Sequence, residues 1–230
     1  MPQSSERRII IALDGPAGSG KSTTARNIAH TLGYVYIDTG AMYRAITLAA
    51  LRAGAAIHND ALQAILQSAR IELLPSTDGQ RTLLNGEDVS AEIRSHEVTE
   101  AVSGVSALGV VRSAMVERQR ELGSAGGVVM DGRDIGTVVF PQAELKIFLV
   151  ASLEERARRR LAELGAGASA ANITLDEMCA QLGERDRQDS EREISPLTKA
   201  TDAIEIDTSA LSIDQQVAQI LAFAHERIQR

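Results

Sequence analysis

Short apolar runs alternate with stretches of helical periodicity along most of the chain, and this alternation predicts an α/β fold. The run at 9–13 is typical of a buried strand, and residues 21–32 have helical spacing that ends at Gly33. We therefore expect a parallel sheet whose strands are joined by crossover helices. The further strands are expected at 34–37, 127–130, 146–150 and 203–206, and the further helices at 41–53, 153–164, 175–188 and 213–228.

The middle of the chain breaks this rhythm. Two strand-like runs, at 70–74 and 81–84, are joined through Asp78 and Gly79, and Asn85-Gly86 then gives a strong hairpin signal. The pattern predicts a small antiparallel insert inside the parallel chain. Two more helices are expected after the insert, at 95–108 and 110–122.

The composition is that of a globular protein, with 44% hydrophobic and 24% charged residues. The net charge of −7 argues against a protein that coats nucleic acid or anionic membranes through bulk electrostatics, although it leaves room for a small basic site. Cys179 is the single cysteine and has no partner for an internal disulfide, so we expect a cytoplasmic protein. The apolar run at 9–13 is too short for a signal peptide or a membrane span. We also expect a monomer.

Residues 15–22, GPAGSGKS, fit the pattern G-x-x-x-x-G-K-[ST] and stand between an expected strand and an expected helix. Backbone N–H groups of such a loop turn toward phosphate oxygens, and the helix N-terminus adds partial positive charge. Lys21 can reach the β- and γ-phosphates, and the Ser22 hydroxyl can ligate Mg²⁺. The loop predicts a nucleoside triphosphate site that uses Mg²⁺. A switch GTPase, a motor ATPase and a small kinase all share it, and the absence of Asn-Lys-x-Asp and of a hydrophobic run ending in paired acids favours the kinase.

Three further clusters carry residue types that bind anions and bases. The sequence DTGAMYR at 38–44 opens an expected helix, so Thr39 is placed to cap it and Arg44 to form paired hydrogen bonds with a phosphate. The sequence DGRD at 131–134 follows a strand, where open α/β sheets bind ligands. Alone, these clusters and ERDRQDSER at 184–192 are also compatible with a helix start, a turn and a solvated helix. Together they supply more guanidinium groups than one triphosphate needs, which favours a second phosphate-bearing substrate: Arg44, Arg112, Arg133, Arg185 and Arg192.

The motifs occur in the order and spacing of a known family. From about residue 8 to the C-terminus the chain resembles the bacterial cytidylate kinases in GPAGSGKST, DTGAMYRA, EVTEAVSGVSALGVVR, DGRDIGTVVFP, KIFL and RDRQDSER followed by SPL. The resemblance implies the P-loop nucleoside monophosphate kinase fold in a single domain, 1–230. Its core would lie at about 8–37, 124–152 and 201–230, its monophosphate-binding part with the insert at about 38–123, and its helical lid at about 156–195.

The resemblance also implies an activity and residue roles, namely transfer of the γ-phosphoryl group of MgATP to CMP or dCMP. ATP phosphates would be held by Gly15, Pro16, Ala17, Gly18, Ser19, Gly20, Lys21, Ser22 and Thr23. Thr39, Tyr43 and Arg44 would line the acceptor pocket; Ser103, Arg112 and Asp134 would face the cytosine; Arg185 and Asp189 would hold the sugar. Arg133 and Arg192 would join Arg44 on the acceptor phosphate, and Lys21, Arg133, Arg159 and Arg192 would act in catalysis, with Arg159 contacting the transferred phosphoryl group.

The chemistry of cytosine agrees with these roles. Its N4 amine can donate to Asp134, and its N3 and O2 can accept from Arg112 and Ser103, whereas uracil reverses two of these partners. The sequence is also compatible with two other functions. One is a kinase of the same fold that acts on UMP, AMP or shikimate, and the other is a nucleotide-dependent switch with a protein partner. Nucleic-acid binding through residues 156–160 is disfavoured by the acidic total and the few aromatic residues. Residues 165–172, GAGASAAN, are compatible equally with a surface connection and with a lid tip.

Overall fold

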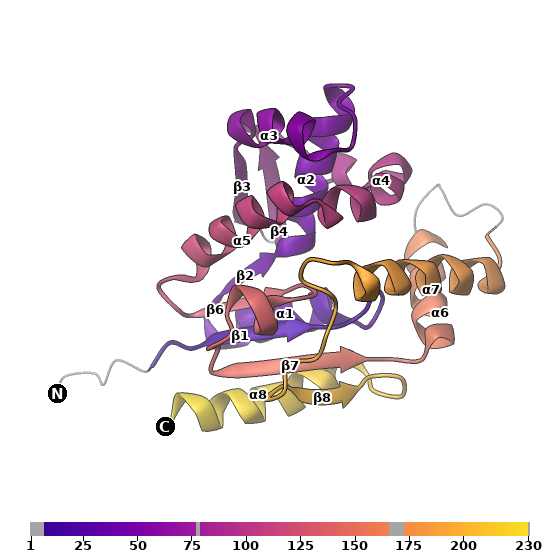
Figure 1. Ribbon diagram of the computed structural model, residues 1–230. Helices are drawn as coiled ribbons and strands as arrows, with labels where there is room; N and C mark the ends of the chain where they lie inside the picture. Colours follow the sequence, from indigo (N-terminus) through magenta and orange to yellow (C-terminus); the bar gives the residue numbers. More distant parts are fainter. Residues whose placement is uncertain (1–6, 77–78, 166–172, 230) are drawn as a thin grey trace.

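The computed structural model describes residues 7–76, 79–165 and 173–229, and within these ranges the fold is built around a parallel sheet of five strands (Figure 1). Neighbouring strands in the order β2-β6-β1-β7-β8 are all paired in parallel, as the alternating pattern predicted. The strands are β1 (Ile10–Asp14), β2 (Val35–Asp38), β6 (Val128–Asp131), β7 (Leu145–Val150) and β8 (Ile204–Asp207). β1 is central, so the segment that leaves its carboxyl end lies in the middle of the sheet edge.

Helices cover the two faces of this sheet. Along β1, Ile11 and Leu13 pack on one side with α1 (Lys21–Leu32) and α8 (Ile213–Ile228), while Ala12 faces the other side. The second side is covered in part by a π-helical turn, Ile135–Val139. The expected helices at 21–32 and 213–228 have the observed bounds. Both sheet faces are therefore apolar, as continuous apolar strands require.

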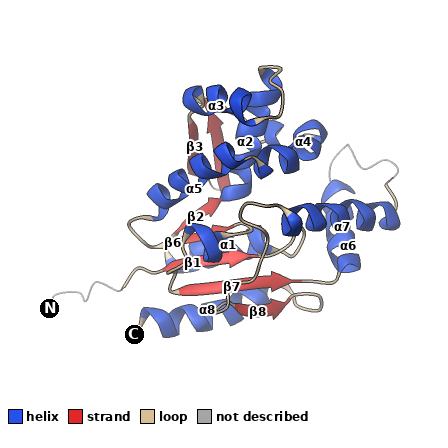
Figure 2. Cartoon of the chain, in the orientation of Figure 1, coloured by secondary structure: helices blue, strands red, loops and turns tan. Residues whose placement is uncertain are grey.

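The insert is antiparallel, as predicted, and consists of β3 (Ile71–Ser76), β4 (Gly79–Leu84) and β5 (Glu87–Asp88). Positive φ angles at Asn85 and Gly86 make the turn between β4 and β5. Figure 2 shows the strands of the insert among helices, in a sheet separate from the parallel one. These elements share a core that includes Met42, Ile46 and Leu62. The helices are α2 (Thr39–Arg52), α3 (Asn59–Ser68), α4 (His96–Ala107) and α5 (Gly109–Gly123), with a 3-10 turn at Glu92–Arg94.

The sequence pattern did not predict α3. Its apolar residues nevertheless recur at helical spacing, at Ala61, Leu62, Ile65 and Leu66, and Leu62 is fully buried. Its cap is unusual, because the His58 ring, rather than a hydroxyl or carboxylate, accepts from the Ala61 N–H at 3.4 Å.

A pair of helices lies at the carboxyl ends of the sheet strands, α6 (Leu153–Gly165) and α7 (Leu175–Glu191) (Figure 1). They pack on each other through Ala157, Met178 and Leu182, with Cys179 partly buried beside them. A capping box between Thr174 and Glu177 starts α7. Residues 166–172, most of the small-residue stretch between the two helices, lie outside the described ranges. In those ranges no helix has the length and apolar character needed to cross a membrane.

Candidate active site

The loop between β1 and α1 has the backbone shape of a phosphate-binding loop. Gly15 has φ +142°, and a Cβ built on it would lie 2.1 Å from the Leu149 carbonyl oxygen, so no other residue fits there. Gly20 starts α1 in a left-handed conformation, with φ 90°. The N-terminus of α1 therefore opens toward the concave side of the loop, where its N–H groups favour an anion.

Lys21 folds back against this loop. Its Nζ donates to the Pro16 carbonyl oxygen at 2.6 Å and to the Ser19 hydroxyl at 3.3 Å, and the residue is buried. Burial, reinforced by the positive charge of Arg133, lowers the pKa of Lys21 to about 7. An anion bound in the loop would favour the protonated form of this amine and so restore its full positive charge. The loop and Lys21 together therefore suit a phosphate group.

Asp131, at the end of β6, joins the donor loop to the next strand. Its Oδ2 accepts from the Ser22 hydroxyl at 2.8 Å and its Oδ1 from the Tyr36 hydroxyl at 2.9 Å. Burial, with a contribution from the charge of Asp38, raises the pKa of Asp131 to about 6. The sequence reasoning placed Asp131 in the DGRD cluster but did not recognise it as the partner of Ser22. The sequence signal for this role is a single acid at the end of an apolar strand. The sequence analysis looked for paired acids, so it did not use this signal.

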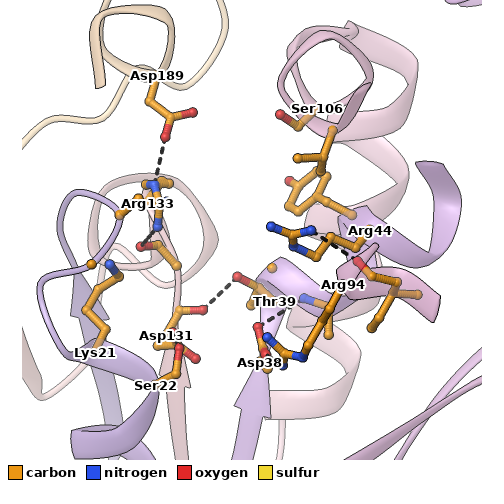
Figure 3. A pocket seen from close by; sticks show the side chains of 18 of the residues that line it. Lys21, Ser22, Asp38, Thr39, Arg44, Arg94, Ser106, Asp131, Arg133 and Asp189 are labelled. Carbon is orange, nitrogen blue, oxygen red and sulfur yellow. Dashed lines mark hydrogen bonds and ion pairs between the residues drawn. The ribbon is translucent and has the colours of Figure 1, made fainter. Parts of the chain in front are cut away.

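A cleft of about 560 Å³ runs from the donor loop across the ends of the strands to α2, α5 and α7. Figure 3 shows Lys21, Ser22 and Arg133 on one side of it and Thr39 and Arg44 on the other. Gly15, Pro16 and Ser19 of the loop do not line it. Fifteen of the residues expected from the sequence do: Ala17, Gly18, Gly20, Lys21, Ser22, Thr23, Thr39, Tyr43, Arg44, Arg112, Arg133, Asp134, Arg185, Asp189 and Arg192.

A buried ion pair, Arg112 with Asp134, lies in the cleft wall. One guanidinium nitrogen of Arg112 donates to Asp134 Oδ2, and both side chains are almost fully buried, 2% and 4% exposed. Another nitrogen of Arg112 donates to the Ser106 carbonyl oxygen at 3.1 Å, and the guanidinium carbon lies 5.4 Å from the centre of the Tyr43 ring. The pair places a hydrogen-bond acceptor, Asp134, beside a hydrogen-bond donor, Arg112, in a buried wall of the cleft. This arrangement can form specific hydrogen bonds with the polar edge of a base.

Three arginines of the cleft are gathered around one carboxylate. Arg133 Nε donates to Asp189 Oδ2 at 2.8 Å, and Arg192 lies 3.4 Å from Asp189 Oδ1. Burial alone would raise the pKa of Asp189, but the charge and hydrogen bond of Arg133 outweigh it and the pKa falls. Burial, together with the charge of Arg133, lowers the pKa of Arg185 to about 10. One carboxylate does not balance three guanidinium groups, so this end of the cleft favours an anionic ligand.

Arg44 lies at the opposite wall. One of its nitrogens donates to the Ile93 carbonyl oxygen at 3.0 Å and to the Thr99 hydroxyl at 2.9 Å. Burial lowers its pKa to about 9, with Arg185 as the next contributor. A carbonyl and a hydroxyl, rather than a carboxylate, therefore hold the Arg44 guanidinium in the cleft. Because neither group carries a charge, the positive charge of Arg44 is available to a ligand.

Outside the donor loop, two expected site residues, Arg159 and Ser103, are not among the residues that line the cleft. Arg159 instead donates to Glu155 at 3.0 Å and to the Thr208 carbonyl oxygen at 2.6 Å, and Arg160 lines the cleft. Successive residues of a helix point about 100° apart, so a choice between adjacent arginines depends on the rotation of α6, which sequence does not reveal.

Ser103 is the second of these residues. It lies on α4 outside the cleft lining, and its carbonyl oxygen accepts from the hydroxyl of Ser106, one turn further along, which does line the cleft.

The cap of α2 is Asp38 and not Thr39. Asp38 Oδ1 accepts from the Ala41 N–H at 3.0 Å, while the Thr39 hydroxyl donates to the Asp131 carbonyl oxygen at 2.7 Å. Gln80 of the insert accepts from the Asp38 N–H at 3.2 Å, and Arg94 lies 3.3 Å from the Asp38 carboxylate. The sequence reasoning missed Gln80 and Arg94, both of which line the cleft, because neither belongs to a motif.

Comparison with known proteins identifies the family of this chain. The sequence profile of the cytidylate kinases matches residues 11–226. The chain is 55% identical over 224 residues to the cytidylate kinase of Geobacillus thermodenitrificans, covering 97% of this chain and 99% of the relative. The chain belongs to the cytidylate kinase family.

Other relatives extend this result. The chain is 51% identical over 232 residues to the cytidylate kinase of Pelodictyon phaeoclathratiforme, covering 98% of each. Among solved structures, a shikimate kinase from Bacteroides thetaiotaomicron covers 95% of this chain and is itself 99% covered, with 13% identity and a TM-score of 0.48. This structural similarity is too low to support an inference about the substrate. As a member of the cytidylate kinase family, the chain is an ATP-dependent phosphotransferase.

Proposed function

We propose that this kinase transfers the γ-phosphoryl group of MgATP to the phosphate of CMP or dCMP, giving ADP and CDP or dCDP. The observation that carries the proposal is the buried pair of Arg112 and Asp134, which lies across one continuous cleft from the donor loop. The loop supplies a triphosphate site, and the pair supplies a base-reading wall.

Cytosine complements the pair in hydrogen-bonding terms. The N4 amine donates to the Asp134 carboxylate, and N3 and O2 accept from Arg112. Ser106 and Ser103 are the hydroxyls near enough in sequence to complete this contact, and Ser106 is the one that lines the cleft. Uracil would place O4 against Asp134 and N3–H against Arg112, so buried groups would lose their partners and the base would be rejected.

The acceptor end follows from the arginines. Arg133, Arg185 and Arg192 lie around Asp189, and Arg44 faces them from α2. We assign Arg44, Arg133 and Arg192 to the acceptor phosphate, and Arg185 with Asp189 to the sugar. The acceptor phosphate is already an anion near neutral pH, so attack on the γ-phosphorus requires no general base. Catalysis then consists of positioning and charge neutralisation.

The donor loop fits Mg²⁺ as the partner of ATP. The metal favours hard oxygen ligands, one or two from the protein and the rest from phosphates and water. The Ser22 hydroxyl and the nearby Asp131 carboxylate, 2.8 Å apart, provide such oxygens. Ser22 would hold the ion directly and Asp131 would orient Ser22. When bound, Mg²⁺ would supply positive charge that neutralises the phosphates of ATP.

We propose that residues at about 156–195 act as a lid over the transferred group. Arg156 fastens this part to the donor loop, because its guanidinium donates to the Ala17 carbonyl oxygen at 3.1 Å and to Asp186 at 2.6 Å. Arg160, which lines the cleft, is better placed than Arg159 to contact the transferred phosphoryl group. Closure over the cleft would exclude water, which otherwise competes as the acceptor.

The deciding experiment is ADP formation from MgATP with CMP, dCMP, UMP, AMP and shikimate in turn. We expect CMP and dCMP to stimulate ADP release strongly and UMP much less. A preference for another acceptor would overturn the assignment of the base-reading wall. Stoichiometric nucleotide binding without acceptor-stimulated ADP release would instead support a nucleotide-dependent switch.

A further inference from the structure

Asp14 is a buried carboxylate at the end of the central strand, only 5% exposed, and the chemistry above makes no use of it. Its two oxygens accept from two successive backbone N–H groups. Oδ1 accepts from Ile135 at 2.8 Å, and Oδ2 accepts from Gly136 at 2.7 Å. Two short bonds to adjacent amides fix the position of that backbone as well as that of the carboxylate.

These two amides begin the π-helical turn Ile135–Val139, where N–H groups have no partner inside the turn. The residue before the turn, Asp134, makes no side-chain cap, because its carboxylate is engaged by Arg112. Asp14 therefore caps this turn from a different strand. A carboxylate is suited to the task, since it accepts two bonds and complements the partial positive charge of amides that have no partner inside the turn.

The capped segment is the one that carries Arg133 and Asp134. Its other end is also tied to β1, because the Gly132 N–H donates to the Leu13 carbonyl oxygen at 3.0 Å. Both ties come from the last two residues of β1, and Gly15 of the donor loop follows immediately. The end of β1 thus sets the position of the acceptor-reading side chains relative to the donor loop.

We propose that Asp14 is a positioning residue, which holds the 132–136 backbone so that Arg133 and Asp134 face the donor loop in the geometry that phosphoryl transfer needs. The proposal rests on the proposed function for the identity of the acceptor. Glycine at position 136 lets the backbone come close to Asp14. A Cβ there would lie 3.3 Å from Asp14 Oδ2 and 3.1 Å from Lys146 Cδ, so a larger residue would crowd the carboxylate.

Lys146 of β7 offers a matched control, because its side-chain carbons lie against Gly136 while its charged end binds elsewhere. It is also buried, and its Nζ donates to the Pro141 carbonyl oxygen at 2.6 Å and pairs with Asp202 at 2.9 Å. It lies outside the cleft lining. Loss of its charge should weaken the fold without displacing Arg133 or Asp134, so it separates stability from positioning.

The test compares Asp14→Asn with Lys146→Met and the wild type. Asparagine has nearly the shape of aspartate but replaces one accepting oxygen with a donor that faces an N–H. We expect Asp14→Asn to raise the KM for CMP by roughly 10- to 100-fold, as small misplacement of positioning groups does, while the KM for ATP stays within about threefold. The ratio of kcat/KM for CMP to that for UMP should fall as well. In Lys146→Met both the CMP values and the ratio should stay at the wild-type level.

A double variant identifies the path of the effect. If Asp14 acts through Asp134, then Asp14→Asn added to Asp134→Ala should raise the KM for CMP by much less than the product of the two single effects. Fully multiplicative effects, or an Asp14→Asn enzyme that behaves like Lys146→Met, would overturn the proposal.

Amide hydrogen exchange gives a readout that does not depend on the acceptor. Ile135 and Gly136 should exchange at least about tenfold faster in Asp14→Asn, with little change in α1. If CMP fails as an acceptor of the wild-type enzyme, the proposed function is wrong. The exchange result, with the kinetics repeated on whichever acceptor is active, then still decides the role of Asp14. Unchanged exchange at both amides would refute it.

Discussion

The donor and acceptor ends of the cleft are built in different ways. The donor end is one contiguous stretch, 15–23, in which backbone amides and glycines form the binding surface and Lys21 is the single basic side chain. The acceptor end is assembled from side chains of α2, α5, the 131–134 segment and α7, which are far apart in sequence. A backbone site requires conformational freedom, whereas a side-chain site requires the fold to bring charges together.

The two ends also manage charge differently. Among the described residues, Lys21 is held by a carbonyl and a hydroxyl and forms no ion pair, and burial then lowers its pKa to about 7. At the acceptor end Arg112 and Arg133 each have a carboxylate partner, Asp134 and Asp189. Removing one member of a buried pair leaves its counter-ion without a direct partner, whereas Lys21 acts on the buried carboxylates of Asp14 and Asp131 only at longer range, through its charge. The two ends should therefore fail in different ways when mutated.

The largest effect is expected for Lys21→Met. It should lower kcat by about 10³-fold or more, because a cation at the transferred phosphoryl group is lost, while the melting temperature stays close to that of the wild type. Steady-state kinetics and thermal melts check both parts. Lys199→Met is the control, since Lys199 pairs with Glu205 at the exposed surface and should leave kcat unchanged. A Lys21→Met enzyme within about tenfold of wild-type kcat would contradict the role of the donor loop.

Asp134→Ala should break the acceptor end in both function and stability. We expect the KM for CMP to rise by about 100-fold with little change for ATP, and the free energy of unfolding to fall by about 3 kcal/mol because Arg112 is left buried without its partner. Adding Arg112→Met should recover much of the stability but none of the CMP affinity. Denaturant titrations beside the kinetics measure the two parts. An Asp134→Ala enzyme with unchanged CMP kinetics would remove the base-reading assignment.

Asp14 lies between the two ends, and its contribution to the free energy of unfolding should depend on pH. Burial, opposed by the two backbone hydrogen bonds, raises the pKa of Asp14 from 3.8 to about 6. Between these values the native state still holds a proton that the unfolded chain has released, so a rise in pH lowers the free energy of unfolding. The stability advantage of the wild type over Asp14→Asn should therefore shrink by about 2 kcal/mol between pH 4 and pH 7. Urea titrations at several pH values check this, and a constant difference would contradict it.

The smallest effect is expected at Thr39, which links the two ends through its bond to the Asp131 carbonyl oxygen. Thr39→Ser keeps the hydroxyl and should leave kcat/KM for CMP within about twofold. Thr39→Val has a similar shape without the hydroxyl, and should lower kcat/KM by roughly fivefold, the value of one hydrogen bond. Equal kinetics for both variants would show that the hydroxyl is dispensable.

The sequence predicted the donor end more completely than the acceptor end, for physical reasons. Backbone sites are local, so the glycines and Lys21 are visible as one motif, and the helix that follows has the predicted bounds. Arg160 and Ser106 line the cleft where Arg159 and Ser103 were expected, because helix rotation decides which neighbour faces it. Asp14 and Gln80 act through contacts between elements distant in sequence, which no local pattern encodes.

The burial of the Arg112–Asp134 pair has a consequence for how the enzyme responds to ionic strength. Salt screens exposed charges over about 10 Å at 0.1 M but has little influence on a pair sealed inside the protein. Arg94, whose side chain is 64% exposed at the cleft, belongs to the screened group. Added salt should therefore slow the capture of nucleotides while the preference for one base over another stays constant. Arrival and selection are governed by different charges, so a cell that changes its ion content alters the speed of this kinase without altering its choice of substrate.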